Sequence, residues 1–395
     1  MASFTLQGRV LAASTAAYCI ANIAWWLQPP LIHEVIVRYD VGEAAAGLVA
    51  SVEMTVIAVS AALFGKLLGR LSLRRIASIG VAVSLSGAAW SITMQDYDLL
   101  LVSRLITGFG EGAMLAAASA SLANFRDPDR AYGIINIATI LFCSAAVFSL
   151  PVTAGYFNVE HNVFPTIFAG IAVLSLLIPM LPGSPVRGQL RSSGTTSPAH
   201  GILSPKLLIL VTAVFVVSLG AGAMWSFYYL LGDMAGLSEV QVHNAVGTAA
   251  LVSVFGALLA TLVGARFGRL LPVTAGIIVL IVAINTMSHW HHPLAFRLGA
   301  ALNVVGMYFL VPYFLGYAAD QDPSGRDAAV TAGAFLLTGA SGPYFGGYII
   351  ENFGAGSMGW IVLIANTSAW YLFLIVNRSL KQSTSPAYRQ TLEQT

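Results

Sequence analysis

Three charged side chains lie inside long apolar stretches of the sequence, where a charge is costly. Glu111 lies in the glycine-rich segment 108–112, Arg104 precedes it by seven residues, and Glu53 lies in a separate apolar run. An unpaired charge at the centre of a bilayer costs about 2.5–3.5 kcal/mol on insertion scales. A carboxyl group that is protonated, paired or open to water avoids this cost, and it can bind and release a proton.

Glu111 and Glu53 are therefore candidate proton-binding groups. The alternative is that each is a protonated side chain, hydrogen-bonded between closely packed helices. Arg104 would share a helix face with Glu111, about 10 Å away along the axis. It could pair with a glutamate or bind an anionic ligand through its guanidinium fork, or it could extend toward lipid headgroups.

Arg297, near the start of another apolar run, is a second candidate for anion binding, although extension toward headgroups is a stronger alternative there. If both arginines faced one cavity, the pair would favour an organic anion. Tyr18, Asn22 and Trp25 follow a helical spacing and could form a cavity wall with polar tips, or anchor the helix at the membrane interface. Trp225 and Tyr228 are candidates of the same kind, again with interfacial anchoring as the alternative. Asn136 and Asn303 could contact a ligand or form interhelical hydrogen bonds, and Tyr344 is a further candidate substrate contact.

Composition indicates which elements must hold these side chains. Hydrophobic residues make up 57% of the 395 residues and charged residues only 9%, whereas soluble domains carry roughly 25% charged residues. The apolar runs are about 20 residues long, which predicts membrane-spanning helices. The expected spans are 9–31, 43–66, 76–95, 98–124, 131–157, 163–182, 206–232, 241–265, 272–288, 294–319, 327–350 and 357–377.

The distribution of positive charge predicts the topology. With both termini in the cytoplasm, all of the 19 lysines and arginines except Arg38, Arg104 and Arg297 fall in cytoplasmic segments, as the positive-inside rule requires. A segment rich in glycine, serine and proline, 184–205, reads as a linker. We therefore expect a six-helix bundle over 1–183, a cytoplasmic linker over 184–205 and a second bundle over 206–395.

The two halves of the sequence resemble each other at a nearly constant offset. Segment 21–25 resembles 221–225, and segment 65–71 resembles 264–270. Arg104 and Arg297 lie in corresponding positions, and segment 151–156 resembles 343–348. Six helices per repeat give the halves parallel orientations, an arrangement that places the substrate between them near the bilayer midplane.

Segment 65–75 resembles the signature loop of the major facilitator superfamily, Gly-x-Leu-x-Asp-Arg-x-Gly-Arg-Arg, with Gly69 at the aspartate position and Ser72 at the second glycine. The arginine–glycine pair Arg104 and Gly108 is similar to a helix 4 motif of that family. Segment 342–347 matches the antiporter motif Gly-Pro-x-x-Gly-Gly better than segment 151–156 does, and helix 11 is the wrong place for it.

The resemblance implies two pseudo-symmetric six-helix bundles that alternate access to a central cavity. It also implies that the helices with Glu53 and Glu111 line this cavity, so that the two carboxyl groups could approach and titrate as a coupled pair. Loop residues at the cytoplasmic face would form the gate, with ion pairs expected between Asp127 and Arg130 and between Asp322 and Arg326. The remaining expected loop residues are Gly65, Arg70, Arg74, Arg75, Gly264 and Arg269.

Other chemistries have little support in the sequence. Cys19 and Cys143 lie inside apolar runs and read as small core residues. The cluster 289–292 contains three histidines in a very short loop, which is poorly suited to a metal site. The chain has no phosphate-binding Gly-x4-Gly-Lys-Ser/Thr loop and no catalytic constellation at membrane depth. We expect no enzyme activity, cofactor, metal or nucleic-acid partner.

The sequence therefore predicts a proton-coupled secondary transporter that moves a small organic solute, with an organic anion favoured. Efflux of lipophilic compounds by proton antiport is the alternative. We expect a monomer in a bacterial inner membrane.

Overall fold

Every regular element that the computed structural model describes is a helix. The described residues are 2–68, 70–125, 127–157, 162–183, 204–264, 266–322 and 326–383. In chain order the elements are α1 (Ala2–Trp26), α2 (Gln28–Tyr39), α3 (Glu43–Gly65), α4 (Leu73–Thr93), α5 (Tyr97–Leu122), α6 (Pro128–Phe157), α7 (Val163–Ser175), the 3₁₀ turn η1 (Ile178–Met180), α9 (Pro205–Ser226), α10 (Tyr228–Met234), α11 (Glu239–Val263), α12 (Leu270–His289), α13 (Pro293–Gln321), α14 (Arg326–Phe353) and α15 (Ala355–Ser383).

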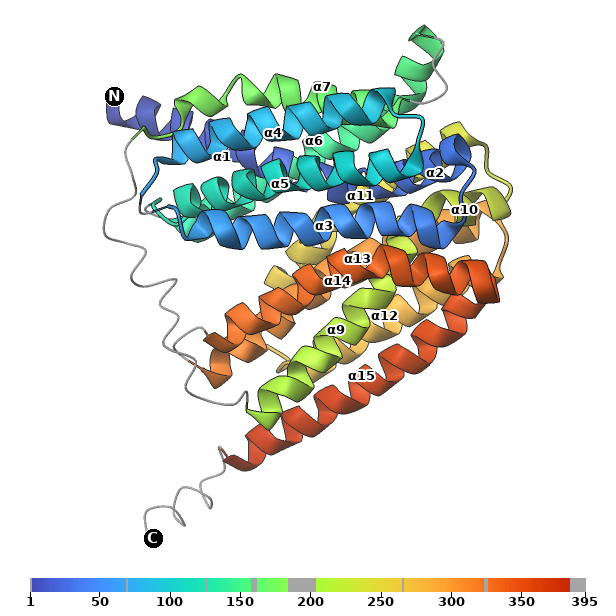
Figure 1. The fold of residues 1–395 in the computed structure, drawn as a ribbon. Coiled ribbons are helices and arrows are strands. Elements are labelled where there is room, and N and C mark those ends of the chain that lie inside the picture. Colours follow the sequence, from blue (N-terminus) through green and yellow to red (C-terminus); the bar gives the residue numbers. More distant parts are fainter. Residues whose placement is uncertain are drawn as a thin grey trace, which may run out of the picture.

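The helices form two groups that lie against each other (Figure 1). We call α1 to α7 the N-terminal half and α9 to α15 the C-terminal half. At one end of the molecule, on the left of Figure 1, α1 begins and α15 ends; we call this the terminal end. The halves converge at the distal end, where α2 and α10 lie, and they diverge toward the terminal end.

Ten helical segments among the described residues are long and apolar enough to cross a membrane, and the bent pair α1–α2 makes eleven if it is one span. The remaining predicted span, 327–350, corresponds to α14, which has 28 residues but is less apolar. Alanine, glycine, serine and threonine are frequent in α14, which packs against both α3 and α9. The predicted count of twelve spans is therefore not reached by length and composition alone.

The first long helix of each half breaks at the same position of the repeat. Leu27 separates α1 from α2, with a bend of 50°, and Phe227 separates α9 from α10. Pro29 and Pro30 explain the first break, because proline cannot continue the hydrogen bonding of the preceding turn. The offset of the two breaks equals that between segments 21–25 and 221–225, so the repeat seen in the sequence is also a repeat of local structure.

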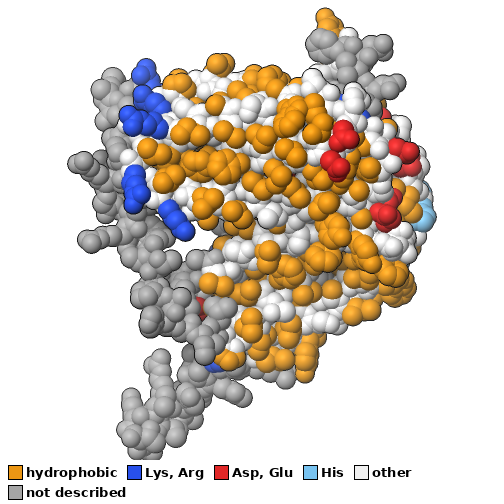
Figure 2. All heavy atoms as spheres, viewed as in Figure 1, with side chains coloured by type: hydrophobic (Ala, Val, Ile, Leu, Met, Phe, Trp, Pro, Cys, Tyr) orange, Lys and Arg blue, Asp and Glu red, His pale blue; other side chains and the backbone are white. Residues whose placement is uncertain are grey.

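Basic and acidic side chains gather at opposite ends of the helices. On the face drawn in Figure 2, lysine and arginine side chains gather at the terminal end, most of the acidic side chains and a histidine lie at the distal end, and an apolar belt lies between them. This belt is the surface expected of a protein whose middle section faces lipid. The predicted linker lies outside the described residues as far as residue 203; Ser204 caps α9, and Pro205 is its first residue.

Glycines allow α3 and α14 to pack closely at the distal end. A Cβ atom at Gly47 would overlap the carbonyl group of Pro343, and one at Gly347 would overlap the carbonyl group of Glu43. Glu351 Oε2 also accepts a hydrogen bond from the backbone N–H of Ala44, at 2.9 Å. This contact joins the two halves over the distal part of both helices.

Candidate functional site

The three charged residues of the apolar runs meet because α3 and α5 pack unusually closely. A Cβ atom at Gly108 would lie 2.7 Å from the carbonyl oxygen of Glu53, and one at Gly112 would overlap Ser60 and the Ile57 carbonyl group. Gly110, between them, faces α4 and packs against Gly80. The alternating glycines of α5 therefore bring its backbone against two helices at once, which places Glu53 beside the buried face of α5.

Arg104 and Glu53 form a buried ion pair. Arg104 Nη1 lies 3.0 Å from Glu53 Oε1, and both side chains are at least 99% buried. Arg104 Nη2 also donates a hydrogen bond to Thr107 Oγ1, at 2.7 Å. A buried ion pair offsets its desolvation only when its remaining polar atoms are also satisfied, and Arg104 Nε has no hydrogen-bond partner among the described residues.

Glu111 completes the group without direct hydrogen bonds. It is fully buried on the same helix as Arg104, and neither of its carboxyl oxygens has a hydrogen-bond partner in the described structure. It interacts electrostatically with Glu53 and with Arg104. Two carboxyl groups therefore share one arginine in an enclosed space, which we call the charged triad (Glu53, Arg104 and Glu111).

An aromatic ring links the triad to a second arginine. The Arg104 guanidinium lies 5.5 Å from the ring centroid of Phe164, and that of Arg38 lies 5.7 Å from it. Arg38 forms an ion pair with Glu34 at 3.8 Å, and Glu34 accepts a hydrogen bond from the backbone N–H of Val163 at 2.7 Å. Phe164 could not be predicted as part of the site, because nothing in an apolar run distinguishes a ring that contacts guanidinium groups from one that faces lipid.

One face of α1 is open although the helix packs against α5, α6 and α7. Its half-buried residues follow helical spacing and include Thr15, Tyr18, Asn22 and Trp25. The Tyr18 hydroxyl donates to Asn136 Oδ1 at 3.3 Å, and Asn136 on α6 is exposed. Three of the predicted substrate contacts from the N-terminal half thus form one accessible polar surface.

This open face of α1 ends at an aromatic contact between the halves. Trp225 Nε1 donates to the carbonyl oxygen of Trp25, at 3.1 Å. The rings of Trp26 and Trp225 meet edge to face at 5.9 Å, and Trp26 stacks on Tyr308 at the same distance. Because Trp25 also lies against glycines of α9 and α14, the open face of α1 looks toward the C-terminal half.

Most of the predicted contacts from the C-terminal half are enclosed rather than open. Tyr228 and Asn303 are buried, and Asn303 Nδ2 donates to the Tyr228 hydroxyl at 2.9 Å, which itself donates to the Ala300 carbonyl oxygen at 3.0 Å. Tyr344 on α14 is partly exposed, and its N–H donates to Ser51 Oγ of the other half at 3.0 Å. These residues lie in or beside the contact between the halves.

Arg104 and Arg297 occupy different environments. Arg104 is fully buried and paired with Glu53, whereas Arg297 is exposed one turn into α13. The structure does not place both arginines on one cavity wall. An organic anion was favoured on the condition that both arginines face one cavity, and this conformation does not meet that condition.

The loop that follows α3 is hydrogen-bonded to the last residues of the N-terminal half, near Leu181. Ser72, at the position of the second signature glycine, accepts a hydrogen bond from the Arg75 N–H at 3.3 Å and caps α4. Arg74 Nε donates to the carbonyl oxygen of Leu181, at 2.9 Å. Gly69, which replaces the signature aspartate, lies outside the described residues.

The corresponding loop of the C-terminal half contains an ion pair. Gly65 ends α3, and Gly264, with φ of 52°, ends the equivalent helix α11. Arg70 is exposed, whereas Arg269 forms an ion pair with Asp320 of α13. The two loops have similar sequences but different contacts.

The remaining loop predictions are only partly covered by the structure. Asp127 Oδ1 accepts a hydrogen bond from the backbone N–H of Arg130, at 3.0 Å, and so caps the first turn of α6. Asp322 ends α13, and the side chain of Arg326 lies outside the described part of the chain. No set of three or more histidine, cysteine, aspartate or glutamate side chains within the described ranges could hold a metal ion.

The sequence model of the Major Facilitator Superfamily matches residues 15–334 of the chain. This chain belongs to the Major Facilitator Superfamily. Membership makes it an integral, multi-pass membrane transporter of small molecules rather than an enzyme. A comparison with curated proteins found no match.

Solved structures of superfamily transporters share the fold at low sequence identity. A bacterial homologue of the human lysosomal transporter Spinster, in an inward-facing and unoccupied conformation, is 18% identical, with 96% of this chain and 99% of that chain covered and a TM-score of 0.69. The nucleoside transporter NupG is 17% identical, with coverage of 95% and 99% and a TM-score of 0.71. These likenesses confirm the predicted fold.

Proposed function

We propose that this superfamily member is a proton-coupled transporter of a small organic solute, and that the charged triad carries the proton. The observation behind the proposal is that Arg104 is the single cation beside two buried carboxyl groups in the described structure. A net charge in such a site is costly, so the group is most stable when exactly one carboxyl group is ionised. The triad then holds one proton that it can exchange.

The contacts suggest where this proton lies. Glu53 is 3.0 Å from Arg104, so it is the carboxylate of the pair. Glu111 has no hydrogen-bond partner among the described residues, which suits a neutral carboxylic acid better than an ion. Loss of the Glu111 proton would create a second negative charge, which Arg104 would have to share with Glu53. The pair would titrate together.

Transport would follow from a change in packing between the halves. The proposed moving bodies are residues 1–183 and 206–395, joined by the linker. Water reaching the triad in one conformation would remove the Glu111 proton, and the competition for Arg104 would weaken its contact with Glu53 on α3. Since α3 packs along α14, a shift of α3 would alter the contact between the halves.

The solute would bind on the open face of α1. Tyr18, Asn22 and Asn136 offer hydrogen bonds, and Trp25 offers a ring at the end of this surface. An organic anion remains one class of solute to test. Arg104 could bind such an anion when Glu53 is protonated, because the guanidinium is then released from its ion pair. Arg297 would contact the solute only in another conformation, in which its part of α13 faces the solute instead of the protein surface.

We propose that the protein lies in a bacterial plasma membrane with its terminal end on the cytoplasmic side, because the lysine and arginine side chains gather at that end (Figure 2). With this orientation the distal contacts close the external side, and the conformation is inward-facing. The loop residues at the terminal end, including the Arg269–Asp320 ion pair, would then border the cytoplasmic entrance. We propose a monomer as the working unit.

Replacing Glu111 with glutamine tests the proposal. A thermal-stabilisation screen against a metabolite library at two pH values first identifies a ligand, and proteoliposomes then measure its transport. We expect Glu111→Gln to abolish accumulation driven by a pH gradient while exchange across the membrane continues. Asp98→Asn, an exposed carboxylate in the first turn of the same helix, serves as the control. Unchanged accumulation by Glu111→Gln would reject the assignment.

Efflux of lipophilic compounds by proton antiport is the second candidate. It is favoured by the apolar half-exposed side chains Phe215 and Leu219 on α9, which contrast with the polar face of α1. Stabilisation by lipophilic cations and none by small acids would support efflux. The reverse pattern would support an anion transporter.

A further inference from the structure

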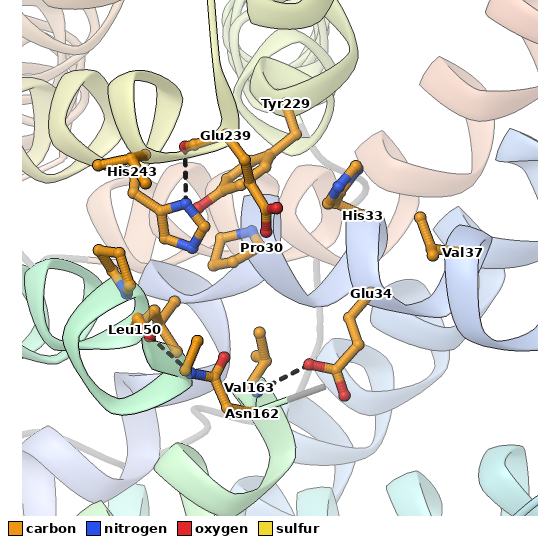
Figure 3. Close-up of a pocket in the computed structure, with 13 residues that line it drawn as sticks. Pro30, His33, Glu34, Val37, Leu150, Asn162, Val163, Tyr229, Glu239 and His243 are labelled. Atoms are coloured by element: carbon orange, nitrogen blue, oxygen red, sulfur yellow. Dashed lines mark hydrogen bonds between the residues drawn. The ribbon is translucent and has the colours of Figure 1, made fainter. Parts of the chain in front are cut away.

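A pocket of about 500 Å³ lies between the halves at the distal end (Figure 3). The N-terminal half contributes residues of α2, α6 and the start of α7, among them His33, Glu34 and Asn162. The C-terminal half contributes Tyr229 of α10 and residues of α11, including Glu239 and His243. The pocket is separate from the charged triad, none of whose residues line it, and its size is that of small-molecule sites in proteins.

Two polar groups in this pocket, a carboxylate oxygen and a phenolic hydroxyl, lack hydrogen-bond partners among the described residues. Glu34 is 95% buried; its Oε2 accepts from Val163, but its Oε1 has no hydrogen bond and lies 3.8 Å from Arg38, beyond hydrogen-bond distance. The Tyr229 hydroxyl is also buried, and no described residue hydrogen-bonds to it. Buried polar atoms are normally hydrogen-bonded, so the Tyr229 hydroxyl and Glu34 Oε1, which has only the ion pair with Arg38, point to a ligand.

His243 and Asn162 add further acceptors, whereas His33, which also lines the pocket, can both donate and accept. His243 Nδ1 lies 2.8 Å from the Glu239 carbonyl oxygen. A carbonyl oxygen can only accept, so Nδ1 carries the proton and Nε2 of the neutral ring is an acceptor. Asn162 donates its amide hydrogens to Leu150 and to Thr153, which leaves its carbonyl oxygen as an acceptor.

Charge narrows the class of ligand further. Glu34 and Glu239 approach from opposite halves (Figure 3), and Arg38, which is paired with Glu34, does not line the pocket. A ligand rich in donors and positively charged would match this wall. Apolar side chains, including Pro30 and Val240, complete the lining and would hold an apolar body.

We propose that this distal pocket binds a small organic ammonium ion, with the ammonium group between Glu34 and Glu239 and the apolar body beside α2 and α11. Because the lining comes from both halves, separation of the halves at the distal end divides the site. The bound ion therefore stabilises the arrangement in which the distal end is closed. The site acts on the transport cycle from the side opposite the terminal end, without occupying the open face of α1.

Benzylammonium is a suitable probe, and benzyl alcohol is its uncharged counterpart. The full chain in phosphatidylcholine nanodiscs is titrated by calorimetry, with empty nanodiscs as the blank. We expect saturable binding of benzylammonium with a Kd on the order of 0.1–1 mM, and no saturable binding of benzyl alcohol. The unfolding temperature should rise with benzylammonium concentration, because only the folded protein has the site.

Two substitutions in the pocket should weaken this binding. Glu239→Gln removes an exposed charge and should raise the Kd roughly three- to tenfold. Tyr229→Phe keeps the ring and removes the orphaned hydroxyl, and it should raise the Kd by a few-fold. Asp98→Asn, which alters an exposed carboxylate outside the pocket, should leave the Kd unchanged.

Binding of benzylammonium is measured on the protein without a pH gradient, whereas proton coupling is measured by transport with Glu111→Gln, so failure of the proposed proton coupling and failure of this site are distinguishable. The proposal is overturned if wild-type protein shows no saturable binding of benzylammonium. It is equally overturned if benzyl alcohol binds as well as benzylammonium does, or if Glu239→Gln and Tyr229→Phe both bind with the wild-type Kd.

Discussion

Replacing Glu53 and Glu111 with glutamine, singly and together, tests whether the two carboxyl groups share the charge of Arg104. Glu111→Gln exchanges one neutral group for another of similar shape and should lower the free energy of unfolding by less than about 1 kcal/mol. Glu53→Gln removes the partner at 3.0 Å, but Glu111 can then ionise in its place. We expect this substitution to cost about 1–2 kcal/mol.

The double substitution leaves a fully buried guanidinium with no carboxylate beside it. Removing one side of a buried ion pair costs about 3–5 kcal/mol, because the remaining charge is uncompensated. The double variant should therefore lose about 2 kcal/mol more than the sum of the single variants, which is a coupling energy expected for groups in one network. This coupling corresponds to roughly a 30-fold change in the unfolding equilibrium.

Reversible unfolding in mixed micelles, with increasing mole fraction of dodecyl sulfate, measures these free energies. Glu53→Gln combined with Asp98→Asn provides the matched control, since Asp98 is exposed and its effect should add simply. If the Glu53 and Glu111 substitutions were additive to within about 0.5 kcal/mol, the two carboxyl groups would act independently. The charge-sharing account of the triad would then be wrong.

Two further substitutions test the packing around the site. Gly108→Ala places a Cβ 2.7 Å from the Glu53 carbonyl oxygen, so it should push α3 away and destabilise the protein by about 1–3 kcal/mol in the same unfolding assay; Gly133→Ala, with open space around it, should not destabilise it. Trp225→Phe removes the hydrogen bond to the Trp25 carbonyl oxygen and should populate conformations open at the distal end. Spin labels on α2 and α10 would report longer distances, and an unchanged distance distribution would contradict this role.

Much of the fold could be predicted because lipid constrains a chain strongly. The scarcity of charge predicted the membrane class, and the lengths of the apolar runs predicted the helices. The breaks at Leu27 and Phe227 were not predicted, because the expected spans 9–31 and 206–232 run through both positions. The span least apparent by apolarity, α14, packs against both α3 and α9, where small residues serve better than large apolar ones.

The candidate site could be predicted only within single helices. The spacing of seven residues placed Arg104 and Glu111 on one face of α5, and both are fully buried there. The partner of Arg104 could not be chosen from the sequence, because it depends on the approach of α3 through Gly108 and Gly112. The distal pocket could not be predicted at all, since its walls come from segments roughly 200 residues apart.

The modest apolarity of α14 has a consequence for biosynthesis. A helix of modest apolarity gains less from contact with lipid, and α14 packs against α3 and α9 in the folded protein. Both of these helices are translated earlier. Both packing surfaces can therefore already be in the membrane when α14 is synthesised, so that its small residues meet helices rather than lipid.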